Sequence, residues 1–446
     1  MKISNEYFLL KDTFDSSELK TKIYSYRESE QIKNGWLVKR FETLLPKIMK
    51  RSGIDFWVVA CNEYNEDPVL KTLVPCAMMT ARRLTILAFY LQADGTVRRM
   101  ALTRPNVGLD DHYEQVWINQ KGSTWAAPLG APGEPETQME CLARIIRECA
   151  PKAIGLNFSK YFAFSDGLSH TLYEMIFEAL DEADKAKVVS AENLCVGWME
   201  ARLPEEIAAY TGIVQIAHSM IAEAFSSRVI TPGVTTNADV KYFMLQRCVD
   251  LGLTPWFDYE VSVKRKGVGS IESDNVVIMP GDILHCDVGI TYLGLCTDTQ
   301  ENAYILEIGE QDAPDYLKAA LKDVNDFQDM VVESYKEGLT GNDILRISLE
   351  KGFAAGLKPC LYTHPIGYHG HGAGPTIGLY DKQGGVEGNG DYPLYEDTCY
   401  SLELNCTVNL PEYNGDIRLG AETDIIFTGG KAYYAAGRQD NWHLVK

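Results

Sequence analysis

The sequence predicts two domains: an α/β domain over residues 1–196, and an α+β domain over residues 197–446 that contains an internal pseudo-twofold repeat. At 446 residues the chain exceeds the length at which a single hydrophobic core stops growing. Helical and strand-like patterns alternate from residue 33 to about 195, which is typical of an α/β domain. In the second half, two segments share the same order of turn and cap residues, which indicates a repeat.

The elements of the N-terminal domain follow from their periodicity. Residues 36–49 have the spacing of an amphipathic helix, and residues 54–61 form an apolar run typical of a buried strand. Residues 82–91 and 97–102 are predicted to be strands on either side of an Ala-Asp-Gly turn, and residues 140–149 to be another helix. The domain contains neither a glycine-rich phosphate loop nor a cluster of candidate catalytic groups. We therefore look for chemistry in the second domain.

A long helix that begins at Pro204 opens the second domain, with Glu205 and Glu206 in its first turn as the helix dipole favours. Residues 230–255 and 335–359 then share the order Gly, apolar, Thr, any residue, Asn, a helix, and Gly-Leu-x-Pro. Three pairs lie 105 residues apart and a fourth lies 104 apart: Gly233 and Gly338, Thr235 and Thr340, Asn237 and Asn342, then Pro255 and Pro359. Chance similarity is the alternative for so short a motif. A true repeat predicts two helix-helix-sheet units, with a ligand site between them that draws on both.

Charge and cysteine usage exclude several classes of partner. The chain has 42 basic and 62 acidic residues, a net charge of −20, which argues against nucleic acid and anionic membranes. Its eleven cysteines are scattered from Cys61 to Cys406 without a CxxC pair, so neither a disulfide framework nor a thiolate zinc site is expected. No signal-peptide core or segment of membrane-spanning length is visible, although a cleaved precursor would leave none. These features favour the cytoplasm.

Three of the eight histidines lie in one short glycine-rich segment, residues 363–374: His364, His369 and His371. Glycine-rich backbone lets side chains approach a ligand but packs poorly, so this cluster indicates a site rather than a core. The alternative is a surface loop in which the histidines are neighbours by chance.

Carboxylates of the same domain lie in strand-like sequence. Asp287 and Asp298 lie on apolar stretches with two glycines between them, which predicts a hairpin that brings them onto neighbouring strands. Aspartate disfavours strand interiors and buried carboxylates repel each other, so the pair would need a cation or a shared proton. Exposed turn residues are the alternative. Glu403 and Glu422 lie in two further strand-like runs. With His364, these four form an oxygen-rich set suited to two divalent ions such as Mn, Co or Zn.

These residues resemble the pita-bread metallohydrolases, the family of aminopeptidase P, prolidase, methionine aminopeptidase and creatinase. The family order Asp, Asp, His, Glu, Glu is met by five residues of this chain: Asp287, Asp298, His364, Glu403 and Glu422. The eleven-residue gap between the aspartates fits, as does His371 seven residues after His364. The N-terminal α/β domain points to the branch that contains prolidase, aminopeptidase P and creatinase.

The resemblance implies that the five residues hold two divalent ions, manganese first among the candidates and cobalt or zinc next. A hydroxide bridging the two metals would attack the amide bond of a short peptide, and Glu403 would carry a proton toward the leaving nitrogen. His371 would face the substrate as a hydrogen-bond donor and proton carrier. We expect His369, which alternates with His371 along the chain, to have a structural or supporting role. The resemblance also implies a homodimer.

Three positions depart from the family pattern. Ser270 and Cys360 stand where the peptidases usually have substrate-binding or auxiliary histidines, seventeen residues before Asp287 and four before His364. Gly420 stands where an arginine is usual, and Arg418 is the nearest arginine. These departures put proline specificity in doubt much more than metal binding.

The sequence therefore predicts a dinuclear metal-dependent peptidase, similar to Xaa-Pro dipeptidases and aminopeptidase P. One alternative is a binding protein that kept the fold and lost catalysis. Another is a creatinase-like C–N hydrolase that acts on a small guanidino or amidino compound without metal. Both alternatives predict an eroded ligand set, and all five ligands are present.

Overall fold

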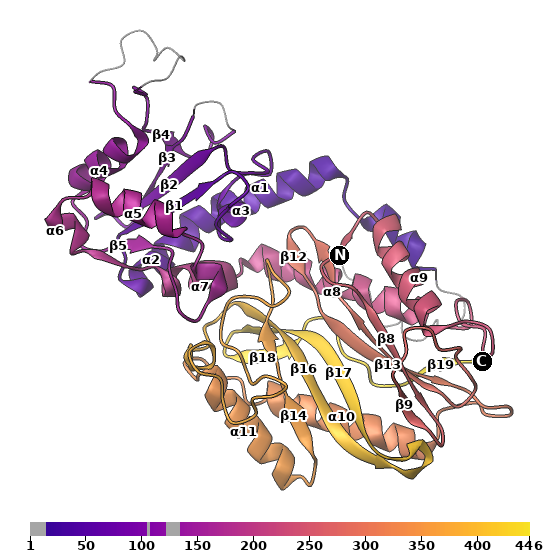
Figure 1. Ribbon diagram of the computed structural model, residues 1–446. Coiled ribbons are helices and arrows are strands. Elements are labelled where there is room, and N and C mark those ends of the chain that lie inside the picture. The colour runs from indigo at the N-terminus through magenta and orange to yellow at the C-terminus, as the bar shows by residue number, and fades with distance from the viewer. Residues whose placement is uncertain (1–14, 105–107, 122–133) are drawn as a thin grey trace. The chain divides into compact units, whose positions relative to one another are not determined.

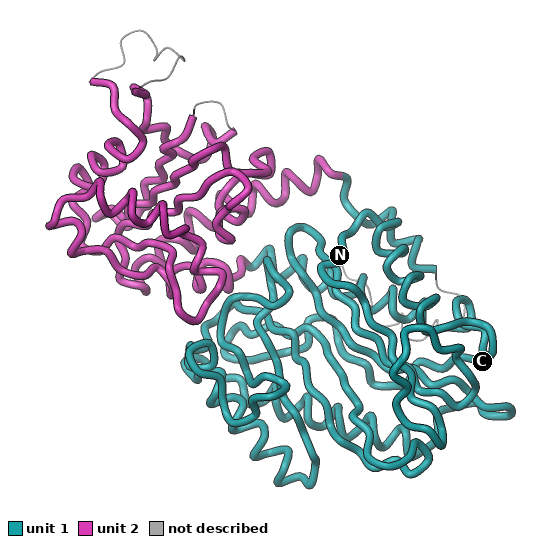
Figure 2. The backbone as a smooth tube through the Cα atoms, in the orientation of Figure 1, with its two compact units in different colours: residues 1–25, 204–446 teal, residues 26–203 magenta. Residues whose placement is uncertain are grey.

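The computed structural model describes residues 15–104, 108–121 and 134–446, which form two compact units (Figure 2). One unit comprises residues 26–203, and the other comprises residues 204–446 together with the described part of residues 1–25. The boundary expected between residues 196 and 197 lies inside one helix, α7 (Glu192–Glu200). None of the described helices is both long and apolar enough to cross a membrane.

The unit of residues 26–203 is built on a six-stranded sheet in the order β4-β3-β2-β1-β5-β6 (Figure 1). Its strands are β1 (Phe56–Asn62), β2 (Leu84–Leu91), β3 (Val97–Leu102), β4 (Glu114–Gln115), β5 (Ile154–Leu156) and β6 (Val188–Ser190). The other helices are α1 (Tyr26–Thr43), α2 (Leu45–Ser52), α3 (Leu70–Leu73), α4 (Gln138–Cys149), η3 (Ala163–Ser165), α5 (His170–Ala179) and α6 (Glu182–Lys185). The three strands and the helix expected from the sequence at 54–61, 82–91, 97–102 and 140–149 are confirmed with small shifts at their ends.

The single helix expected over residues 36–49 was wrong, because this stretch spans the end of α1 and the start of α2. Pro46 lies in the first turn of α2. Proline lacks the N–H that would continue the first helix and its ring clashes with the preceding turn, so the chain restarts there.

The C-terminal unit is built on a ten-stranded, mainly antiparallel sheet with a path of β14-β16-β17-β13-β10-β8-β9. Its strands are β8 (Glu260–Arg265), β9 (Gly269–Ile271), β10 (Ile283–Val288), β13 (Thr299–Ile305), β14 (Pro359–Leu361), β15 (His364–Pro365), β16 (Thr398–Leu410), β17 (Gly415–Thr428), β18 (Lys431–Tyr434) and β19 (His443–Val445). A three-stranded sheet is formed by β7 (Thr254–Pro255), β11 (Ile290–Tyr292) and β12 (Leu295–Cys296). The helices are η2 (Ser16–Lys22), α8 (Pro204–Ala224), α9 (Asn237–Asp250), α10 (Asp315–Val332), α11 (Gly341–Ala354), η4 (Asn389–Asp391) and η5 (Pro411–Tyr413).

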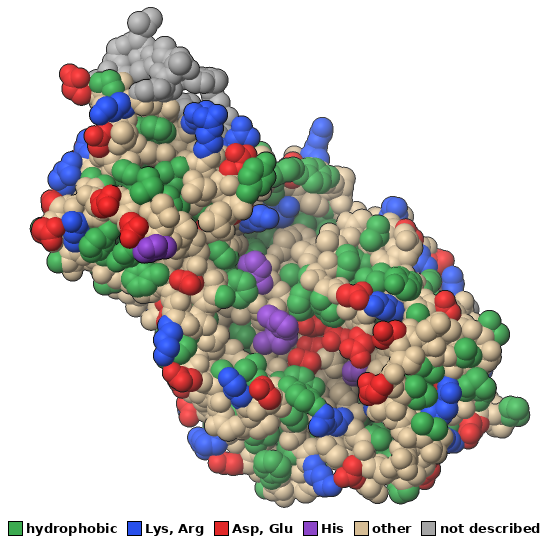
Figure 3. All heavy atoms as spheres, in the orientation of Figure 1, with side chains coloured by type: hydrophobic (Ala, Val, Ile, Leu, Met, Phe, Trp, Pro, Cys, Tyr) green, Lys and Arg blue, Asp and Glu red, His purple; other side chains and the backbone are tan. Residues whose placement is uncertain are grey.

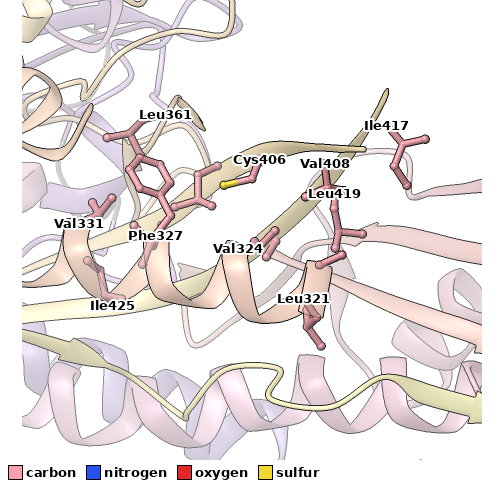
Figure 4. Close-up of a cluster of buried hydrophobic side chains, with 14 of the residues drawn as sticks. Leu321, Val324, Phe327, Val331, Leu361, Cys406, Val408, Ile417, Leu419 and Ile425 are labelled. Atoms are coloured by element: carbon pink, nitrogen blue, oxygen red, sulfur yellow. The ribbon is translucent and has the colours of Figure 1, made fainter. Parts of the chain in front are cut away.

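Helix α10 covers one face of this sheet with an apolar core (Figure 4). Phe327 and Val324 of the helix belong to the same buried cluster as Leu402 and Leu404 of β16. Side chains alternate between the two faces of a strand. Glu403, which lies between those two leucines, is therefore directed to the opposite face. The apolar core thus places the polar residues of β16 on the face that α10 leaves free.

The two halves of the internal repeat begin their helices α9 and α11 in the same way. Each helix starts with a capping box, formed by Thr236 with Asp239 in the first and by Thr340 with Asp343 in the second. The threonine of the first half that matches Thr340 is therefore Thr236, and the pairing of Thr235 with Thr340 was wrong by one residue. The capping residue is the one whose side chain reaches the N–H groups of the first turn, which have no partner within the helix. The spacing in the sequence alone did not identify which threonine this is.

Candidate active site

The five predicted ligands lie on adjacent parts of the large sheet. Asp287 is on β10, Asp298 directly precedes β13, His364 is on β15, Glu403 is on β16 and Glu422 is on β17. The sheet register pairs Glu403 with Glu422, and Asp287 with a residue of β13 that is itself paired with Glu422. Figure 3 shows acidic and histidine side chains gathered in a hollow on this face of the C-terminal unit.

The ligand atoms of these residues fall within a few ångströms of one another. His364 Nε2 lies 3.6 Å from Asp298 Oδ2 and 3.7 Å from Glu422 Oε1. Two groups have ligand atoms all within 4.8 Å: Asp287 with Asp298 and Glu422, and His364 with Glu403 and Glu422. The fold therefore brings all five residues together, although they come from five separate segments of the chain.

Four buried ligand atoms have no hydrogen-bond partner among the described residues: Asp287 Oδ1, Asp298 Oδ1, His364 Nε2 and Glu422 Oε2. Buried polar atoms are normally satisfied, and an unsatisfied carboxylate oxygen is costly. His364 Nδ1 lies 3.1 Å from the Pro365 carbonyl, so a proton on Nδ1 leaves Nε2 as an electron-pair donor. Carboxylate oxygens and one imidazole nitrogen are a donor set that fits divalent metal ions.

The electrostatics of the site also favour a cation. Burial and the charge of Glu422 raise the pKa of Asp287 to about 8 and that of Glu403 to about 9. The same two causes raise the pKa of Asp298 well above its usual value. Burial lowers the pKa of His364, but the nearby Glu422 carboxylate outweighs it and raises that pKa to about 9. Without a cation, Asp287, Asp298 and Glu403 retain protons near neutral pH, and a divalent ion would take the place of those protons.

His371 lies beside this cluster. Its ring centroid is 4.6 Å from that of His364 and 5.4 Å from that of Trp256, both in edge-on contact. Burial and the neighbouring His364 lower the pKa of His371, which keeps the imidazole neutral at neutral pH. Its ligand atom also lies within 4.8 Å of those of Asp298 and His364, so the geometry permits either a substrate contact or a metal contact. His369 is half-buried.

A hydrogen-bonded chain of side chains, not predicted from the sequence, ends on Glu403. Gln300 Nε2 donates to Glu403 Oε1 at 2.6 Å. His285 Nε2 lies 3.0 Å from Gln300 Oε1, and its Nδ1 lies 3.1 Å from Asn302 Oδ1. The available signal was strand alternation, because His285 and Gln300 are each two residues from a predicted ligand aspartate.

These hydrogen-bonded side chains explain one of the three departures from the family pattern, the glycine at position 420. A Cβ atom at Gly420 would lie 2.9 Å from His285 Cε1 and 3.1 Å from Gln300 Oε1, both closer than ordinary contact. His285 therefore occupies the volume that a side chain at position 420 would need. Cys360 is half-buried with its Sγ 3.8 Å from the Tyr380 carbonyl, and Ser270 is exposed on β9.

Comparison with known proteins decides the family. Residues 209–428 match the model of metallopeptidase family M24. The C-terminal unit is an M24 metallopeptidase domain. Metallopeptidases of this family use divalent metals, and the cluster described above is the candidate site for them in the M24 domain. The expectation of an enzyme that hydrolyses peptide bonds is thereby confirmed.

Solved structures share the fold of the M24 domain and of the N-terminal unit. The X-Pro aminopeptidase of Thermotoga maritima is 18% identical with a TM-score of 0.58, covering 89% of this chain and 100% of its own. The Xaa-Pro dipeptidase of Bacillus anthracis is 18% identical with a TM-score of 0.56, and the match covers 92% of this chain and 100% of the dipeptidase. A dipeptidase of Mycobacterium ulcerans is 17% identical with a TM-score of 0.57, and the match covers 92% of this chain and 98% of that dipeptidase. No curated protein matches the chain. The predicted fold class, an α/β domain followed by a pita-bread domain, is confirmed.

Proposed function

We propose that the protein is a dinuclear metallopeptidase that hydrolyses an amide bond in short peptides. The five predicted ligands would hold two divalent ions: Asp287, Asp298, His364, Glu403 and Glu422. The observation that carries the proposal is the convergence of four buried, unsatisfied donor atoms from four of these residues. The predicted ligands fall into two groups that share Glu422, one with Asp287 and Asp298 and the other with His364 and Glu403, and this division supports two ions rather than one.

The roles of the side chains follow from their positions. Bound ions would supply the nucleophile by lowering the pKa of water toward neutrality. Glu403 would accept the proton of the attacking water and deliver it to the leaving nitrogen. The Gln300 amide, 2.6 Å from Glu403 Oε1, would hold that carboxylate in one orientation. Neutral His371 would donate a hydrogen bond to the carbonyl oxygen as negative charge develops on it.

The expected substrate preference is argued from the three positions at which this chain differs from the family pattern. The structural relatives named above are described as acting on Xaa-Pro bonds or as dipeptidases. This chain has Ser270, Cys360 and Gly420 at the three positions that depart from the family pattern, so we expect weak activity on simple Xaa-Pro dipeptides. Manganese is the first candidate metal, with cobalt or zinc next.

We also propose that the protein is a homodimer, which light scattering would test. We further propose a cytoplasmic location, which the eleven free cysteines favour.

Replacing Asp298 with alanine is expected to remove at least one of two bound ions, because it takes away a carboxylate that faces three other candidate ligands. Elemental analysis of protein supplied with Mn, purified without chelator, gives the ion count. Asp381→Ala, at an exposed position, is the matched control and should keep both ions. Wild-type protein that binds less than one ion per chain would contradict the proposal.

The stability of the metal-free protein is expected to fall as the pH rises from about 5 to 9. The folded pKa values of Asp287 and Glu403, about 8 and about 9, exceed the ordinary values of 3.8 and 4.5. Between these limits the folded state binds more protons than the unfolded chain, so raising the pH favours unfolding. Metal-loaded protein should lack this contribution. Thermal unfolding across this range should therefore show a Tm difference between loaded and metal-free protein that widens with pH. A constant difference would contradict the expectation.

A further inference from the structure

The side chain of Trp256 contacts three segments that carry predicted site residues. Trp256 follows β7 in the chain, at the start of the loop that leads into β8. Its backbone N–H donates to the Gly289 carbonyl at 3.4 Å, and its indole Nε1–H donates to the Thr297 carbonyl at 2.8 Å. Thr297 directly precedes Asp298, and Gly289 lies two residues after Asp287. One residue is thus hydrogen-bonded to the segments of two predicted metal ligands.

Two glycines leave room for the indole ring. A Cβ atom at Gly289 would lie 2.1 Å from Trp256 Nε1, and a Cβ atom at Gly370 would lie 2.3 Å from Trp256 Cη2 and Cζ2. Both distances are far below ordinary van der Waals contact, so the ring lies directly against the backbone of both glycines. Neither glycine has a left-handed φ, so close approach of the ring, not backbone conformation, excludes a side chain at both positions.

The same ring contacts His371, the residue after Gly370. The two ring centroids are 5.4 Å apart, and the ring planes are inclined at 76°. His371 is exposed and lies in the glycine-rich segment, so its own backbone restrains it little. Among the described residues its imidazole forms no hydrogen bond, and its ring contacts are with Trp256 and His364. These two rings therefore set the direction of the His371 side chain.

The indole is itself held by packing. The ring of Phe257 contacts it edge-on, with 4.4 Å between centroids. Phe257 in turn contacts Tyr259 at 5.8 Å, and Tyr259 is buried directly before β8. A hydrogen bond, two glycine contacts and this row of aromatic rings fix the indole in one position, as a residue that orients others requires.

We propose that Trp256 is a positioning residue of the active site. Its indole holds the segments of Asp287 and Asp298 in place to bind metal, and it keeps the His371 imidazole directed at the substrate. The inference rests on the proposed function, which assigns the roles of these three residues. Trp256 itself carries no proton and binds no metal, and it acts only through the residues that it holds.

Trp256→Leu is expected to weaken the binding of Mn by roughly ten- to a hundredfold, as the loss of a residue that orients metal ligands typically does. At saturating Mn it should lower kcat by about 10²-fold with little change in KM, because a small displacement of a catalytic group costs about that much. Calorimetric titration with Mn gives the dissociation constant, and peptide cleavage gives kcat and KM. The matched control is Trp117→Leu in the N-terminal unit, where the indole also donates to a backbone carbonyl, that of Glu136 at 2.9 Å.

Gly370→Ala tests the contact from the other side. The added methyl group would overlap the indole and displace it, so kcat should fall in the wild-type background. In Trp256→Leu the indole is gone, so the same substitution should have a much smaller effect, and the two changes should be non-additive. Gly384→Ala is the matched control, because a Cβ atom there meets nothing within 4 Å, and it should leave kcat and Mn binding unchanged.

Unchanged Mn binding and kcat in Trp256→Leu would show that the indole only packs and would overturn the inference, as would additive effects of the two substitutions. If Trp256→Leu does not fold, the comparison of Gly370→Ala with Gly384→Ala decides, and equal kcat and Mn binding in the two overturns the inference. Absence of cleavage by Mn-loaded wild type would instead contradict the proposed function, and the Mn dissociation constants of the variants would still decide on Trp256. A wild type that neither cleaves peptides nor binds Mn would overturn both.

Discussion

Replacing His371 with alanine is expected to lower kcat by roughly 10²- to 10³-fold while the protein keeps its bound metal. The imidazole lies beside His364, with 4.6 Å between ring centroids, and its lowered pKa keeps it neutral. A hydrogen-bond donor directed at a developing oxyanion is worth about 10²–10³ in kcat. The measurement is kcat of the metal-loaded variant on a peptide that the wild type cleaves, with elemental analysis of the same preparation.

The matched control is His369→Ala, two residues away in the same glycine-rich segment, which should change kcat far less. Loss of an ion in His371→Ala would show that His371 is a metal ligand, as its distance to Asp298 and His364 also permits. Unchanged kcat with unchanged metal would remove His371 from the mechanism altogether.

Replacing Glu301 with leucine is expected to lower the free energy of unfolding by about 3–5 kcal/mol. The carboxylate is buried between two histidines, His218 of α8, 2.5 Å away at Nδ1, and His443 of β19. Burial raises the pKa of Glu301, but these histidines outweigh it and lower that pKa to about 2. The ionised carboxylate thus ties a helix and the last strand to β13, and its loss leaves two buried imidazoles without their acceptor.

Denaturant unfolding of the metal-loaded protein measures this effect, and Glu337→Leu at an exposed position is the control, with an expected change within about 0.5 kcal/mol. Metal content should not change, because Glu301 points to the opposite face of β13 from Gln300. A loss below about 1 kcal/mol would show that the buried cluster contributes little. Since the folded pKa of Glu301 is lowered, its contribution is present above about pH 4.5 and is lost as the pH falls toward 2.

The sequence by itself determined the local elements and the set of candidate ligands. Apolar periodicity predicted β1, β2, β3 and α4, because alternation and helical spacing are properties of short stretches of chain. The order and spacing of the five ligands, from Asp287 to Glu422, predicted the family of the catalytic domain. The repeat was visible because both halves use the same turn and cap chemistry.

Only the tertiary structure decided which side chains meet and which face they occupy. Gln300 and Glu403 are 103 residues apart in the chain, and they form a hydrogen bond because β13, β17 and β16 lie in adjacent positions in one sheet. The same long-range pairing places His285 over Gly420. None of these contacts has a local signature, since strand register is set by packing against α10 and by pairing between distant segments. The sequence therefore predicted which groups could hold a metal, and the folded sheet decided what surrounds them.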